Sequence, residues 1–135
     1  MNTSALRKLL GHAMLAACLY SDAAMANDFD GSKPLICATQ EAGMLSDGED
    51  YVKERPADLG VPVFMRVDLA SKTIAGPKTT TQIRVIEKGE NQLLLQGTEK
   101  GFAWTIALDQ ETGGLSGTLV DRSGVIALFG SCTLL

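Results

Sequence analysis

The sequence predicts an all-β fold, an antiparallel up-and-down meander of about eight strands that forms a small closed or nearly closed barrel. From residue 35 onward, short apolar runs alternate with turn-forming residues, and no stretch of helix length repeats its apolar residues every 3.6 positions. Most connections are short, about two to five residues, whereas a parallel crossover needs a dozen or more. The alternative arrangement of the same strands is a two-sheet β-sandwich.

The first element is a predicted secretory signal peptide over residues 1–26. Two basic residues are followed by an apolar stretch from Leu9 to Tyr20, and Ala24-Met25-Ala26 supplies the small residues of a cleavage site. Cleavage there leaves a single barrel-like domain over residues 27–135. We therefore expect a periplasmic or secreted protein.

A second interpretation of the same region is a lipoprotein signal. Leu15-Ala16-Ala17-Cys18 resembles a bacterial lipobox, in which Cys18 carries a lipid anchor and the product is membrane-anchored. The apolar run before Cys18 is short and interrupted by Gly11-His12. This interruption favours the unanchored product.

The predicted strands follow one another through the remainder of the chain. They span residues 35–44, 63–69, 73–76, 82–87, 92–98, 102–109, 115–121 and 125–132. Alternation is clearest in two of them, where the residues expected to face the core are Phe102, Trp104, Ile106 and Leu108, and Val63, Met65, Val67 and Leu69. One-sided burial of this kind fits a sheet whose outer face is wet.

Two turns repeat one pattern. In residues 68–76 and 109–117, an Asp is followed by a hydroxyl residue three positions later, an aliphatic residue six later and a Gly eight later. An Asp side chain can accept hydrogen bonds from backbone N–H groups two or more residues ahead. We therefore expect Asp68 and Asp109 to form turns rather than to act in catalysis.

Residues 46–62 interrupt the regular spacing with a long, charged segment. Pro56 is placed to open a short helical turn through Leu59, and Gly60 is placed to end it. Long connections in small domains are often functional. The candidate partner-binding residues in this segment are Asp47, Glu49, Asp50 and Tyr51.

Arg66 and Arg84 are further candidates, because both lie opposite the bulky residues of predicted strands. The simplest role for them is surface ion pairing with Asp68 or Glu87. The alternative is an anion-binding or partner-binding patch.

Cys37 and Cys132 form an even pair in a chain expected to be exported, and therefore predict a disulfide. This bridge would tie the first predicted strand to the last. It would also leave no thiolate to act as a nucleophile.

The composition is incompatible with several function classes. The only histidine, His12, lies in the predicted signal peptide, so catalysis by a Ser-His-Asp or Cys-His arrangement and His-ligated zinc are not expected. No Gly-rich phosphate loop is present, and the acidic clusters lack the calcium-loop pattern. A net charge of −4 argues against nucleic-acid binding. We expect no cofactor, no metal site, no catalytic residue and no transmembrane helix.

Three segments, residues 33–38, 61–68 and 129–133, give the chain a resemblance to a family of small exported proteobacterial proteins without assigned function. Many members carry a further cysteine pair in the segment corresponding to residues 43–52, where this chain has none. The resemblance implies an exported compartment and a related fold. It implies no activity.

Three functions remain open. We favour a non-catalytic envelope protein that binds a partner through the 46–62 segment. The first alternative is a lipocalin-like carrier of a small apolar ligand, and the second is a minimal carboxylate-dependent hydrolase, although nothing in the sequence fixes a carboxylate pair at the required separation. Only 5% of the residues are aromatic, which favours a filled barrel over a ligand pocket.

Overall fold

The computed structural model describes residues 28–135, so the predicted signal peptide and Cys18 lie outside the described residues. The described chain is all-β, as predicted, with one 3-10 helix, η1 (Pro56–Leu59). Its strands are β1 (Leu35–Ser46), β2 (Val52–Glu54), β3 (Phe64–Asp68), β4 (Thr73–Ala75), β5 (Thr80–Gln82), β6 (Val85–Lys88), β7 (Gln92–Glu99), β8 (Phe102–Asp109), β9 (Gly114–Val120) and β10 (Gly124–Leu134). Within residues 28–135, no helix has the length and apolar character to cross a membrane.

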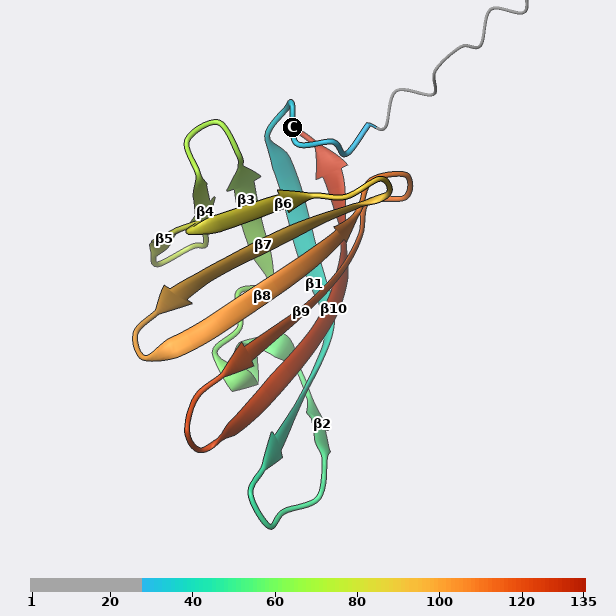
Figure 1. Cartoon of the computed structure of the whole chain (residues 1–135). Helices are drawn as coiled ribbons and strands as arrows, with labels where there is room; N and C mark the ends of the chain where they lie inside the picture. The colour runs from blue at the N-terminus through green and yellow to red at the C-terminus, as the bar shows by residue number, and fades with distance from the viewer. Residues whose placement is uncertain (1–27) are drawn as a thin grey trace, which may run out of the picture.

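The strands form one curled antiparallel sheet in the order β5-β4-β3-β1-β10-β9-β8-β7-β6 (Figure 1). Its two outermost strands, β5 and β6, are consecutive in the chain. Between them the backbone changes partners, because the N–H of Ile83 donates to the carbonyl of Lys72 and the N–H of Arg84 donates to the carbonyl of Gln96, each at 2.8 Å. The sheet edges are thereby brought together into a nearly closed barrel.

Strand β1 is the centre of this arrangement. It pairs with β10 along its whole length, and its other edge is shared, with residues 35–38 on β3 and residues 42–44 on β2. Strand β2 is therefore the return strand of a hairpin inside the 46–62 segment, which we had expected to be a loop with one helical turn. The helical turn itself is confirmed, ending at Gly60 with a φ of 72°.

The predicted disulfide joins Cys37 and Cys132, which lie directly opposite each other on β1 and β10. Their Cα atoms are 3.9 Å apart and both residues are buried. The bridge links positions 95 residues apart in the sequence. The first long strand of the barrel is thus covalently fixed to the last.

The barrel interior is filled by apolar side chains, including Trp104, Ile106 and Leu108 from the predicted inward face of β8. Val63 differs from the prediction, since 41% of it is exposed. The ladder between β1 and β3 ends at the pair Ala38–Phe64, beside an irregularity in β1, so Val63 lies outside it.

One end of the barrel is covered by the segment that precedes β1. Phe29 packs against the core, and its ring lies beside Gly113. Its N–H donates to the carbonyl of Gln110. Phe29, three residues after the predicted cleavage site, is therefore part of the fold.

The two Asp turns form as predicted. The Asp68 carboxylate accepts the N–H of Ser71 at 3.1 Å, and Asp109 accepts those of Glu111 and Thr112, both at 2.8 Å. The same arrangement occurs at Asp30 and Asp121, which the sequence analysis did not single out.

These hydrogen bonds favour the ionised carboxylate. At Asp109, the N–H groups of Thr112 and Glu111 hold the pKa below its usual value of 3.8. At Asp30 and Asp121, the pKa is lowered chiefly by hydrogen bonds from Ser32 and Ser123.

Candidate binding surfaces

The β1–β2 hairpin extends beyond the barrel and carries four of the predicted binding residues (Figure 1). Its tip turns where the N–H of Glu49 donates to the carbonyl of Ser46. Asp47, Glu49 and Asp50 are all exposed there. The hairpin therefore presents a compact acidic turn to solvent.

Tyr51, just before β2, lies over Gly43 of β1, whose directly opposite residue is Lys53. A side chain at Gly43 would overlap the Tyr51 ring, so the ring lies directly on the Gly43 backbone. Aromatic side chains commonly cover cross-strand glycines in this way. Tyr51 is still 57% exposed, and it lies on the outer face of β1, the same face as Leu45.

Leu45 belongs to an apolar row that crosses three strands. Strand register places it opposite Val125 of β10, and Val125 lies opposite Val120 of β9. The exposed fractions are 49% for Leu45, 37% for Val125 and 41% for Val120. Together with Tyr51 they place a contiguous apolar surface where the outer face of an antiparallel sheet is usually polar.

We call these four apolar residues and the acidic turn the hairpin face. The acidic turn and Tyr51 were predicted from the sequence as binding residues, whereas Leu45, Val120 and Val125 were not. A signal for the two valines was present, since each occupies an outward position of its strand. Only the strand order shows that they align with Leu45.

Arg66 and Arg84 do not share a surface. Arg66 lies on β3, whereas Arg84 lies at the β5–β6 junction, and β4 and β5 separate the two positions. The expected pair between Arg66 and Asp68 is present at 3.7 Å. Within residues 28–135, no ion pair joins Arg84 to Glu87.

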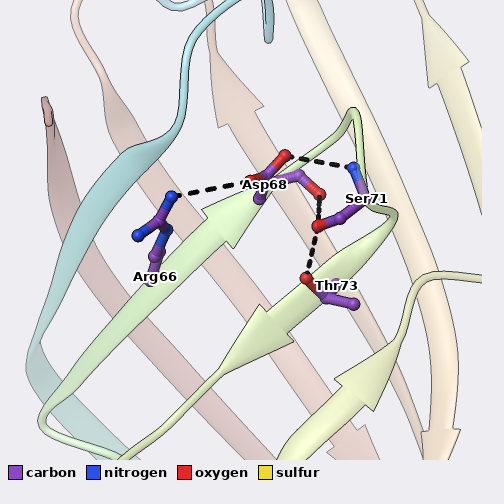
Figure 2. A network of polar contacts seen from close by, with 4 residues as sticks. All are labelled: Arg66, Asp68, Ser71 and Thr73. Carbon is purple, nitrogen blue, oxygen red and sulfur yellow. Dashed lines mark hydrogen bonds and ion pairs between the residues drawn. The ribbon is translucent and has the colours of Figure 1, made fainter.

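Figure 2 shows how Asp68 divides its contacts. One carboxylate oxygen faces the Arg66 guanidinium, and the other accepts the Ser71 N–H. The Ser71 hydroxyl also lies 2.7 Å from that of Thr73. Asp68 is thus held by its own turn, and it positions Arg66 on the outer face of β3.

Beside Arg66 is a depression of about 570 Å³, which we call the basic groove. Three cationic side chains line it, Arg66, Lys78 and Lys100. They come from β3, from the turn before β5 and from the turn before β8. Because these segments are far apart in the sequence, the two lysines could not be grouped with Arg66 before the fold was known.

A second depression, of about 700 Å³, is lined by both polar and apolar residues, among them the carboxylates Glu41 and Asp109 and the ring of Phe129. A hydrolase of the glycosidase type needs one carboxyl group whose surroundings keep it protonated. Asp109 is instead stabilised as an anion by its turn, and the exposed Glu41 forms a 3.0 Å ion pair with Lys53. The surroundings of Asp109 are therefore not those of a general acid.

The described residues, 28–135, contain no group of three or more His, Cys, Asp and Glu side chains able to hold a metal ion. Comparison of the chain with protein-family models, with curated proteins and with solved structures gives no match.

Proposed function

We propose that the chain is an exported, non-catalytic protein that binds a protein partner of the cell envelope through the hairpin face. The observation that carries this proposal is the alignment of Val120, Val125, Leu45 and Tyr51 into one exposed apolar surface. Large exposed apolar surfaces beside polar residues are typical of interaction sites. The buried disulfide is compatible with the oxidising compartment that export implies.

The charge beside this surface indicates the chemistry of the partner. Asp47, Glu49 and Asp50 border the apolar row, so a complementary surface has an apolar centre and a basic rim. The same carboxylates would be repelled by the anionic lipids of a membrane surface. A basic protein surface is therefore the favoured partner.

The packing of the barrel favours surface binding over the carrier function. Leu35, Leu93 and Leu95 are 0% exposed, and they fill the space in which an apolar ligand would have to lie. Both depressions described above are lined largely by exposed and half-buried residues, outside this packed interior.

Photocrosslinking tests the proposal. A benzophenone amino acid introduced at Tyr51 or Val125 should give one adduct of the same discrete mass in intact cells. The matched control is the same residue at Arg84, which is exposed but distant from the hairpin face in the sheet. An adduct of the same mass and yield at Arg84, or no adduct at the two test positions, would reject the proposal.

Charge reversal at the acidic turn provides a second test of the proposal. The triple variant Asp47→Lys, Glu49→Lys, Asp50→Lys should abolish the adduct because like charges then face each other across the interface. These side chains are exposed, so the melting temperature should stay within a few degrees of that of the native protein. An undiminished adduct would show that the acidic turn takes no part in binding.

A further inference from the structure

The basic groove differs from its surroundings in charge. The chain has a net charge of −4, yet no carboxylate lines this depression. Asp68 balances part of the charge of Arg66, but Lys78 and Lys100 form no ion pair within residues 28–135. The groove therefore concentrates positive potential on an otherwise acidic molecule.

The donors of Arg66 are also largely unused. Within the described residues the guanidinium makes no hydrogen bond, since its 3.7 Å contact with Asp68 is longer than one. A planar guanidinium can bind a carboxylate or phosphate through two parallel hydrogen bonds. The Ser71 turn fixes Asp68, and Asp68 keeps the guanidinium nearby, while the N–H groups of Arg66 remain free for a ligand.

Apart from Thr79 and backbone groups, the rest of the lining is apolar. Phe64 lies two residues before Arg66 on the same face of β3, and it is 61% exposed. Ile36 of β1 lies opposite Arg66, and Val63 extends the apolar wall. A volume of about 570 Å³ falls in the range of small-molecule sites.

We propose that the basic groove binds a small amphipathic anion, a carboxylate or phosphate head group joined to an apolar chain. The head group lies against Arg66, with Lys78 and Lys100 adding long-range attraction, and the apolar part lies on Phe64, Val63 and Ile36. The hairpin face shares no residue with this groove. An experiment that rejects one of the two proposed sites therefore leaves the other proposal standing.

Calorimetric titration of the oxidised protein with decanoate and with decyl phosphate, each below its micellar concentration, tests the proposal. At least one should bind, and the stronger of the two identifies the preferred head group. Decanol has the same chain without charge, and acetate and inorganic phosphate have the charge without the chain. Binding of any of these three as tightly as the best amphiphile would overturn the proposal.

Matched variants locate the site. Arg66→Gln should weaken binding by about tenfold or more, since a charge-assisted bidentate contact is lost, and Arg66→Lys should recover part of it. Phe64→Ala should also weaken binding, whereas Arg84→Gln, which removes one exposed cation elsewhere, should have no effect. Equal affinities of Arg66→Gln and Arg84→Gln would exclude the groove.

Amide chemical shifts of the native protein provide a measurement that needs no variant. Addition of the tighter-binding amphiphile should shift the resonances of Phe64, Arg66, Lys78 and Lys100. Shifts confined to the depression beside Glu41 and Asp109, or to the β1–β2 hairpin, would place the site elsewhere and overturn the assignment.

Discussion

At the scale of single residues, most of the specific polar contacts of this protein fix turns. Asp30, Asp68, Asp109 and Asp121 each accept a backbone N–H two or three positions ahead. Because these hydrogen bonds are exposed, each contributes only modestly to the free energy of unfolding. Three of them lie in the short connections β3–β4, β8–β9 and β9–β10, which suits a meander, because each short connection must set the register of the strands that it joins.

The lowered pKa of Asp109 predicts a pH dependence of stability. Its native pKa lies below the unfolded value of 3.8, so its contribution is complete above about pH 5 and is lost as the pH falls through the native pKa. Asp109→Asn should flatten the fall of the urea midpoint between pH 5 and pH 3. Asp47→Asn, which alters an exposed carboxylate without a turn contact, should reproduce the native profile.

A side chain added at Gly97 should have a steric effect on stability. A side-chain carbon there would overlap the Trp104 ring and would lie 2.7 Å from the carbonyl oxygen of Gln82. Gly97→Ala should lower the free energy of unfolding by about 1–3 kcal/mol, as overpacking usually does. Urea denaturation measures this, with the exposed neighbour variant Thr98→Ala as the control. Equal stabilities of the two variants would contradict the prediction.

At the scale of elements, the junction of β5 and β6 closes the barrel. Ile83 occupies this junction and is only 4% exposed. The adjoining Thr81 hydroxyl donates to the carbonyl of Thr98 at 3.2 Å, so the β5 edge also contacts β7. Closure thus depends on one buried side chain and a few hydrogen bonds rather than on a continuous ladder.

Ile83→Ala should therefore destabilise the protein by about 2–5 kcal/mol. Ile86→Ala, on the half-buried neighbouring position of β6, should cost less. Chemical denaturation of both variants checks the order. A larger loss at Ile86 would mean that packing along β6 matters more than closure at the junction.

The elements also show what the sequence could predict. The long strands were predictable because bulky and small or polar residues alternate along them, as in β8. The helical turn η1 followed from the positions of Pro56 and Gly60. Strand β2 escaped prediction because its three residues are all exposed, so no apolar alternation marks it.

The candidate sites were predictable only where their residues are close together in the sequence. Asp47, Glu49, Asp50 and Tyr51 are close in sequence and meet in one hairpin. The apolar row and the basic groove depend on strand order and on turns that meet only in the folded barrel. A single sequence carries little information about such long-range pairing.

At the scale of the whole molecule, the disulfide is the strongest single constraint. It closes a loop between positions 95 residues apart, and the chain-entropy model gives about 4.7 kcal/mol for a loop of this length. Both sulfur-bearing residues are buried in the core. The bridge therefore restricts the unfolded chain more than it alters the surface.

The double variant Cys37→Ala, Cys132→Ala should lose about 4.7 kcal/mol of unfolding free energy relative to the oxidised protein. Reductant should lower the urea midpoint of the native protein and leave that of the double variant unchanged. Titration of the unreduced, denatured protein should find no free thiol at these positions. Identical midpoints of the oxidised protein and the double variant would refute the stabilising role.

The position of β10 constrains the order of assembly. This strand is the last in the described chain, yet it pairs with both β1 and β9 and so joins the two halves of the sheet. During synthesis, β1 can pair with β2 and β3 early, but its longest partner, the 11-residue β10, is made after all the other described strands. Pairings between distant segments form slowly. A chain in which β10 has not yet formed therefore cannot join the two halves of its sheet.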